Sequence, residues 1–216
     1  MRHHDCFLLE DDPYGELRFA GRDLPPVYKE RPENSLLLGT FSKIAAPGFR
    51  LGWIVAQGEI MERLVIAKQA ADLHTGSLDQ MIVQRFLQDN DFEAHVLRIR
   101  KLYGGQCQAM QASIARHFPK DVSVTQPQGG MFLWATLPDG ISSMELLKLA
   151  VAQKVAFVPG EAFHVDGTGG NTLRLNYSNA DAATIDEGIQ RLARCMELCR
   201  AGKTSVEADM QYGCQD

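Results

Sequence analysis

The first part of the chain, up to about residue 90, alternates between short apolar runs and turns. Three of the runs are continuously apolar, and they cover Cys6–Leu9, Ser35–Gly39 and Gly52–Ala56. Such runs are typical of strands in a parallel sheet that is covered on both faces. Apolar residues at helical spacing follow, and they predict helices over about 58–71 and 77–88.

The pattern changes after the polar Asp89-Asn90-Asp91, where a long helical repeat begins and runs from 92 to 117. Beyond it the sequence predicts strands over 122–126, 131–136, 155–158 and 172–175, and helices over 143–153 and 181–199. This mixture predicts a compact α+β domain of ordinary size. We therefore expect an α/β layer in residues 1–90, a small α+β domain in residues 91–200, and a polar tail in residues 201–216.

The three apolar runs of the first part raise a physical difficulty. Buried strands need helices on both faces and usually further strands beside them. The first run begins about five residues into the chain, and no crossover helix precedes it. Because an exposed apolar edge promotes aggregation, we expect that another chain covers this edge or that the sequence is a piece of a longer one.

Composition narrows the possible partners and the compartment. Lys and Arg total 22 and Asp and Glu total 27, which gives a formal net charge of −5, so neither nucleic acid nor a membrane is the expected partner. The chain has no run long enough to span a bilayer and no signal peptide, so a cytoplasmic protein is expected. Its five cysteines are scattered, which favours reduced thiols. Cys195 and Cys199 lack further ligands, so no metal site is expected.

The segment from Leu38 to Trp53, LGTFSKIAAPGFRLGW, has the most informative chemistry. Two hydroxyl residues, Thr40 and Ser42, precede Lys43, and Arg50 follows seven residues later. Apolar flanks partly desolvate a lysine and favour its uncharged, nucleophilic amine. Hydroxyls and a guanidinium are suitable ligands for a phosphate monoester. The alternative is a surface lysine on a turn.

Two other segments contain charged residues in notable places. Asp11 and Asp12 follow the first apolar run, at the strand end where open α/β sheets bind ligands. A solvated turn explains them equally well, and a metal site lacks further ligands. Arg174 lies in the apolar run 172–175, where an unpaired charge is costly, so we expect an anionic partner. A structural salt bridge is the alternative to a ligand.

Taken together, six segments resemble the fold-type I pyridoxal-phosphate (PLP) aminotransferases of class I/II. They are most similar to the 2-aminoadipate, aromatic and kynurenine aminotransferases. The segments are EDDPYGELRF, GTFSKIAAPGFRLGW, AKQAADLHT, PQGGMFLW, VAFVPGEAFH and NTLRLNYS, in the family's order over about residues 5 to 200. The resemblance implies that residues 1–90 are the C-terminal part of the PLP-binding large domain, and that residues 91–200 are the small domain.

The resemblance also implies a role for each site residue. Lys43 would bind PLP covalently and later move a proton between the substrate Cα and the cofactor C4′. Asp11 would pair with the pyridine nitrogen, and Tyr14 would hydrogen-bond the phenolic oxygen of the ring. The phosphate would be held by Thr40, Ser42 and Arg50.

For the substrate, the resemblance implies that Arg174 binds the α-carboxylate. The reaction would be transamination of 2-aminoadipate, an aromatic or a branched-chain amino acid with a 2-oxo acid such as 2-oxoglutarate. The enzymes of this family act as homodimers. The part of the family that lies upstream of EDDPY includes a phosphate-binding loop, an aromatic residue that stacks on the cofactor, and the asparagine of an NPxG motif that bonds the ring oxygen. None of these three has a counterpart here.

Two other functions fit the same segments. Some bacterial winged-helix (GntR/MocR-type) transcriptional regulators contain an aminotransferase-like effector domain that senses PLP. The third reading is an inactive fragment, which would be poorly soluble and would bind no cofactor.

Overall fold

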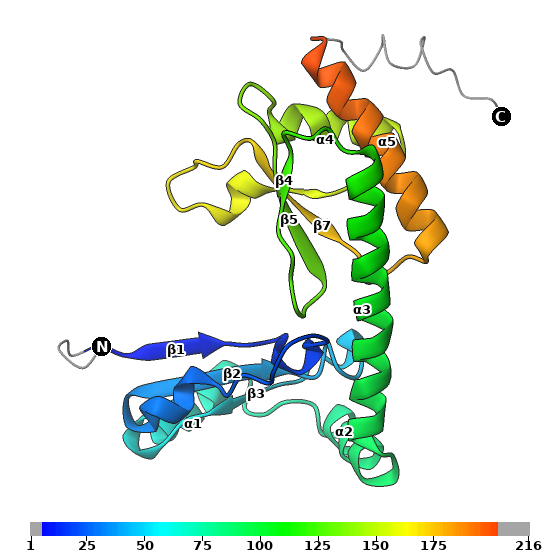
Figure 1. Cartoon of the computed structure of the whole chain (residues 1–216). Helices are drawn as coiled ribbons and strands as arrows, with labels where there is room; N and C mark the ends of the chain where they lie inside the picture. The colour runs from blue at the N-terminus through cyan, green and yellow to red at the C-terminus, as the bar shows by residue number, and fades with distance from the viewer. Residues whose placement is uncertain (1–5, 203–216) are drawn as a thin grey trace. The chain divides into compact units, whose positions relative to one another are not determined.

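The computed structural model describes residues 6–202, drawn as a coloured ribbon in Figure 1. The chain forms two compact units that divide between Lys101 and Leu102, inside the long helix α3 (Phe92–His117). We call them unit 1 and unit 2, and each is described by itself. The domain boundary at residue 90 stays a prediction, and most of the expected tail, 201–216, lies outside the described residues.

Unit 1 contains a three-stranded sheet in the order β1-β2-β3. The strands are β1 (Leu8–Asp11), β2 (Ser35–Thr40) and β3 (Gly52–Val55). β1 and β2 are parallel, with Asp11 opposite Leu38, whereas β2 and β3 are antiparallel. The carboxyl ends of β1 and β2 therefore lie at the same edge of the sheet.

The expectation of a parallel sheet covered on both faces is wrong for β3. The loop between β2 and β3 holds one 3₁₀ turn, Pro47–Phe49, whereas a parallel connection usually needs a crossover helix. Trp53, Ile54 and Val55 are 38%, 45% and 40% exposed, so β3 is not buried in the core of unit 1. The Trp53 ring lies over Gly39, where a Cβ atom would come within 2.0 Å of the indole.

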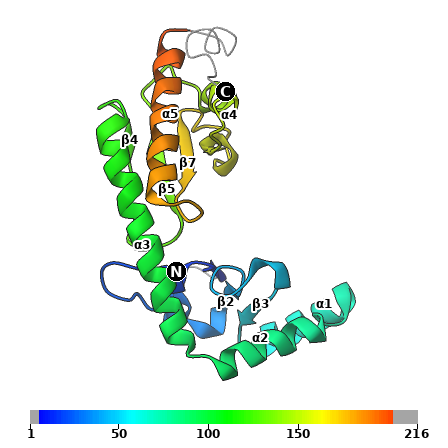
Figure 2. The ribbon, with the colours of Figure 1, turned by 90° about the vertical axis from the view of Figure 1, so that its right-hand side faces the viewer.

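Helices α1 (Gly58–Asp72) and α2 (Ser77–Asp89) confirm the helical periodicity (Figure 2). Their apolar side chains are nevertheless mostly exposed, and α1 buries none of its residues. The large exposed apolar side chains on the two helices are Val65, Ile66, Leu78, Met81, Ile82 and Leu87. The sequence thus encodes an apolar stripe that no part of the described chain covers.

Unit 2 is an antiparallel sheet with helices packed on it, and its strand order is β4-β5-β7-β6. Its strands are β4 (Ser123–Val124), β5 (Phe132–Thr136), β6 (Val158–Pro159) and β7 (Thr172–Asn176). Its further helices are α4 (Ser143–Ala152) and α5 (Ala182–Arg200). These elements confirm the α+β pattern read from the sequence, although β4 and β6 are shorter than expected.

Helix α5 supplies much of the core of unit 2. Figures 1 and 2 both show it alongside the C-terminal half of α3. Ile185, Ile189, Leu192 and Met196 recur at helical spacing and are all buried. Asp181 caps the helix by accepting a hydrogen bond from the Thr184 amide at 2.8 Å.

Among the helices of residues 6–202, none has both the length and the apolar content of a membrane span.

Candidate cofactor and substrate site

The loop after β2 is built around the hydroxyl of Thr40. Its Oγ1 atom donates to the Leu51 carbonyl at 3.1 Å and accepts from the Ser42 amide at 3.0 Å. The Ala45 amide closes the following turn on the Phe41 carbonyl at 2.8 Å. The hydroxyl hydrogen of Thr40 is therefore used within the loop, so the structure gives Thr40 a role in shaping this turn. Its role in phosphate binding stays a prediction.

Ser42 and Arg50 lie next to each other in this loop. Arg50 Nη1 is 3.5 Å from Ser42 Oγ and donates to the Pro47 carbonyl at 3.2 Å. The Arg50 backbone is left-handed, with φ of 52°, a conformation that few non-glycine residues adopt and that clusters at functional sites. A hydroxyl and an exposed guanidinium placed together can hold a phosphate group.

Lys43 and Tyr14 come together from the loops that follow β2 and β1. The Lys43 Nζ atom lies 5.8 Å from the centroid of the Tyr14 ring, and both side chains are half-buried. Asp11 ends β1 and is exposed at the same edge of the sheet. This edge is where open α/β sheets bind ligands.

The donor set of this edge fits PLP. Ser42 and Arg50 supply a hydroxyl and a positive charge for the phosphate, and Lys43 supplies a primary amine for the aldehyde. Asp11 supplies a carboxylate for the ring nitrogen, and Tyr14 supplies a phenol beside the lysine. Ser42, Lys43 and Arg50 thus share one loop. Lys43 also lies near Tyr14, which comes from the loop after β1.

Arg174 belongs to unit 2, in β7, where it pairs with Trp134 of β5. Its guanidinium carbon lies 4.1 Å from the ring centroid of Phe132 and 4.6 Å from that of Phe163. Its Nε atom is buried and finds no hydrogen-bond acceptor among residues 6–202. An unsatisfied donor on a positive charge is costly, so the guanidinium that carries it is a candidate for an anionic ligand.

From the sequence, the partner of Arg174 is either an anionic ligand or the carboxylate of a structural salt bridge. No ion pair to Arg174 occurs within the described part of the chain, so a structural salt bridge is not found there. Sequence reasoning missed Phe132 and Phe163, which enclose the guanidinium. The sequence holds a signal for Phe132. It is two residues from Trp134 in a predicted strand, so the two side chains lie on the same face, and Trp134 is the residue that pairs with Arg174.

Glu10 has a structural role that the sequence analysis did not predict. Its carboxylate accepts hydrogen bonds from the amides of Val27 at 3.0 Å and Tyr28 at 2.7 Å. Glu10 therefore anchors the loop before β2. Asp12 donates its own amide to the Leu38 carbonyl at 3.1 Å, which extends the ladder beyond β1.

The thiols and acidic groups of the described residues form no metal site. No group of three or more His, Cys, Asp or Glu side chains is placed to hold an ion in residues 6–202. Cys107 and Cys195 are buried, and burial raises the pKa of the Cys195 thiol to about 11. Cys199 is half-buried and Cys6 is exposed, whereas Cys214 lies outside the described residues.

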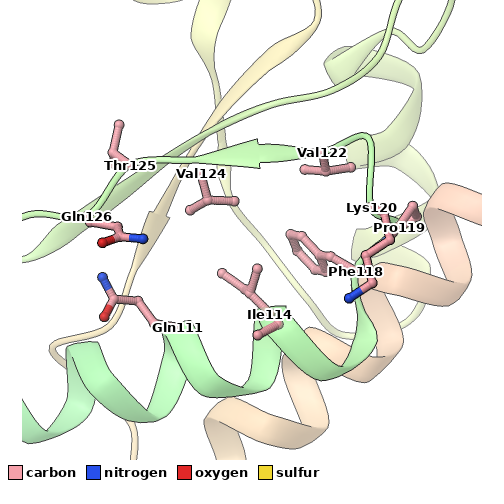
Figure 3. A pocket seen from close by; sticks show the side chains of 10 residues that line it. Gln111, Ile114, Phe118, Pro119, Lys120, Val122, Val124, Thr125 and Gln126 are labelled. Carbon is pink, nitrogen blue, oxygen red and sulfur yellow. The ribbon is translucent and has the colours of Figure 1, made fainter.

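A cavity of about 310 Å³ lies in unit 2, between the end of α3 and β4 (Figure 3). Ile114, Phe118 and Val124 line its apolar wall, and Gln111 and Gln126 lie across from each other at one end. None of the predicted site residues lines this cavity. We therefore describe two separate candidate positions, the sheet edge of unit 1 for a cofactor and Arg174 of unit 2 for an anion.

Comparison with known proteins shows the family of this chain. The family model described as aminotransferase class I and II matches residues 1–192. The chain is 42% identical to the aromatic-amino-acid aminotransferase 1 of Thermococcus litoralis, over 90% of this chain and 47% of that protein. It is also 42% identical to the 2-aminoadipate transaminase of Thermus thermophilus, over 88% of this chain and 49% of that protein.

A solved structure gives the same result at the level of the fold. The crystal structure of the α-aminoadipate aminotransferase LysN from Thermus thermophilus, in complex with N-(5′-phosphopyridoxyl)-L-leucine, is similar with a TM-score of 0.86 at 42% identity. The similarity covers 90% of this chain and 51% of that one. The chain belongs to the class I and II aminotransferases, and it spans about half the length of the curated relatives it matches.

A more distant relative belongs to another functional class. The chain is 28% identical to an HTH-type transcriptional regulator of Escherichia coli that is itself called uncharacterized, over 90% of this chain and 42% of that protein.

Proposed function

We propose that this chain supplies the lysine-bearing part of a PLP-dependent aminotransferase. The reaction is transfer of an amino group from an amino acid to a 2-oxo acid such as 2-oxoglutarate. Two relatives at 42% identity support 2-aminoadipate or an aromatic amino acid as the donor, and a branched-chain donor is the further candidate. We also propose that the full enzyme is a cytoplasmic homodimer.

One observation carries this proposal. A single loop after β2 contains Lys43 together with a hydroxyl and guanidinium pair, with Ser42 Oγ and Arg50 Nη1 3.5 Å apart. A phosphate-binding pair in the same loop as a half-buried lysine is the combination that a phosphorylated aldehyde requires.

Each residue at this edge then has a chemical task. Ser42 and Arg50 would hold the phosphate, and Asp11 would pair with the pyridine nitrogen as a carboxylate. Lys43 would hold the cofactor at its aldehyde carbon, and once released its free amine would move the proton from the substrate Cα to the cofactor C4′. Tyr14 would donate its hydroxyl hydrogen to the ring oxygen. PLP, when bound, supplies an electron sink for the pair of electrons left on Cα.

Arg174 binds the carboxylate of the amino acid in this proposal. Its buried Nε atom has no acceptor among residues 6–202, and the rings of Phe132 and Phe163 lie against the guanidinium. A carboxylate can therefore take up a charge-assisted bond that nothing else in the described chain occupies.

The test is to incubate the purified chain with PLP, reduce it with borohydride, and locate the modified residue by peptide mass spectrometry. We expect the label on Lys43, and Lys43→Ala abolishes it. The matched control is Lys68→Ala, because Lys68 is a lysine of α1 whose amine is 2.7 Å from Asp72. Label spread over surface lysines, or label unaffected by Lys43→Ala, would overturn the proposal.

The effector domain of a transcriptional regulator is the second candidate, and the 28% identity to an HTH-type regulator favours it. The higher identity to aminotransferases, 42%, favours the enzyme. Sequencing of the gene upstream of Met1 distinguishes them. A basic helix-turn-helix segment there supports the regulator, and an NPxG motif supports the enzyme.

A further inference from the structure

His95 connects helix α3 to the loop that contains Lys43. Its Nε2 atom lies 2.9 Å from the backbone carbonyl oxygen of Ile44, the residue immediately after Lys43. The Ile44 side chain is buried at 7% exposure, so the loop is held at this point by both its backbone and its side chain. His95 and Ile44 both belong to unit 1.

The contacts of the His95 ring define its hydrogen positions. A carbonyl oxygen only accepts, so Nε2 must carry the hydrogen. Arg98 Nη2 approaches Nδ1 at 3.5 Å as a donor, which leaves Nδ1 as an acceptor. The ring also packs against Phe86 edge-on, with centroids 5.3 Å apart, and stacks with Phe92 at 6.3 Å. An imidazole ring with a fixed orientation therefore donates to the lysine loop.

Arg100, on the same helix, holds the loop that contains Tyr14. Its Nε atom donates to the Glu16 carbonyl at 2.6 Å, and its Nη2 atom lies 3.2 Å from the Glu16 carboxylate. Glu16 is two residues beyond Tyr14 and lies in the 3₁₀ turn Gly15–Leu17. Helix α3 is thus bonded to the backbone of both loops whose side chains, Lys43 and Tyr14, face each other.

We propose that His95 and Arg100 are positioning residues that set the placement of the Lys43 amine relative to the Tyr14 ring. The inference rests on the proposed function, because it concerns how the cofactor-binding lysine is held. Neither side chain need touch cofactor or substrate. Each acts by fixing the backbone of one loop, so that Lys43 Nζ is ordered before any ligand arrives.

Each substitution removes one hydrogen bond from α3 to a loop backbone: the bond to Ile44 for His95 and the bond to Glu16 for Arg100. A hydrogen bond of this kind adds little net stability, but its loss at Ile44 leaves a part-buried carbonyl without its partner. The Lys43 loop should then open about 3- to 10-fold more often, and its amides should exchange faster by the same factor.

The first experiment measures hydrogen–deuterium exchange of the full chain without cofactor. We expect His95→Leu to accelerate exchange in a peptide that covers residues 41–45 about 3- to 10-fold, with no change in residues 14–17. Arg100→Met should accelerate exchange in residues 14–17 alone. The matched controls are His74→Leu and Arg63→Met, two exposed residues outside both contacts, and they should change neither peptide.

A pair of milder variants keeps the test decisive if His95→Leu unfolds unit 1. His95→Gln places an amide nitrogen near the position of Nε2 and should preserve slow exchange in residues 41–45. His95→Asn is one carbon shorter and should not. Equal exchange in these two variants, or an equal rise throughout unit 1 including α1, would overturn the inference.

The second experiment measures the rate of borohydride-trapped PLP labelling at Lys43. His95→Leu and Arg100→Met should lower this rate about 3- to 10-fold, and His95→Gln should restore it. The two proposals fail separately. A wild-type chain that does not label Lys43 overturns the proposed function, whereas altered labelling with unchanged amide exchange overturns the positioning role.

Discussion

At the scale of single residues, a hydroxyl or a charge acquires its role from the atoms around it. Thr40 matches the expected site sequence, yet its hydroxyl donates to Leu51 and accepts from Ser42, so it shapes the loop. Arg174 was expected to have an anionic partner, and its Nε atom has no acceptor in the described chain. The type of a residue is therefore enough to make it a candidate for a site. Its role becomes clear only from the contacts that its atoms make.

Arg174 gives a prediction in which stability and binding respond in opposite ways. Arg174→Met removes a partly buried charge without breaking an ion pair among residues 6–202, so the thermal unfolding midpoint should stay unchanged or rise. Binding of 2-oxoglutarate, measured by calorimetry on the full chain, should be lost. The control is Arg191→Met, which removes bonds to Glu187 and the Gln153 carbonyl and should lower the midpoint. A larger drop for Arg174→Met than for Arg191→Met would contradict a ligand-binding role.

At the scale of elements, periodicity predicted the bounds of the helices well, but it did not predict the direction of every strand. Helices α1, α2, α3 and α5 begin and end within one or two residues of the expected ranges. β3 was misjudged because an apolar run has no information about the direction of its neighbour, and the loop without a helix decided it.

The contact between α3 and α5 predicts a pH dependence. Asp186 of α5 accepts from Ser113 Oγ at 2.6 Å and from Gln190 Nε2 at 2.8 Å, and it pairs with Arg116. These bonds, first among them that from Ser113, hold the pKa of the Asp186 carboxyl well below its usual range. His117 Nε2 also lies 3.3 Å from the same carboxylate.

The sign follows from the lowered pKa in the folded state. The stabilisation by Asp186 is fully present above the unfolded-state pKa of about 3.9 and is lost as the pH falls through the folded-state value. Asp186→Asn should therefore lower the urea midpoint at neutral pH, and its difference from the wild type should shrink below about pH 4. Asp139→Asn, in an exposed turn, is the control. A difference that stays constant with pH would refute the assignment.

At the scale of the whole molecule, the two units differ in how much apolar surface they cover. Large side chains with almost no exposure are concentrated in unit 2, including Leu133, Leu173 and Leu192. In unit 1, β3 and the apolar faces of α1 and α2 remain exposed in the described residues. The sequence led us to expect an open edge beside the first strand, and β1 is an edge strand of the sheet in the described residues. The exposed apolar faces of β3, α1 and α2 were not expected from the sequence.

This difference predicts unequal local stability. Amide hydrogens of α5 and β7 should exchange much more slowly than those of α1 and α2, because local opening costs more where more apolar area is buried. Hydrogen–deuterium exchange with peptide resolution on the full chain measures this directly. Equal protection in the two units would contradict it.

The sequence by itself determined the elements, the α/β and α+β character of the two parts, and the residue types of the site. These follow from local rules, because the period of apolar residues and the chemistry of side chains are properties of neighbouring positions. Only the tertiary structure decided the direction of β3, the aromatic enclosure of Arg174, and the bonds of His95 and Arg100 to the loops of Lys43 and Tyr14. Those features join residues far apart in the chain, and periodicity marks which face is apolar without specifying what covers it.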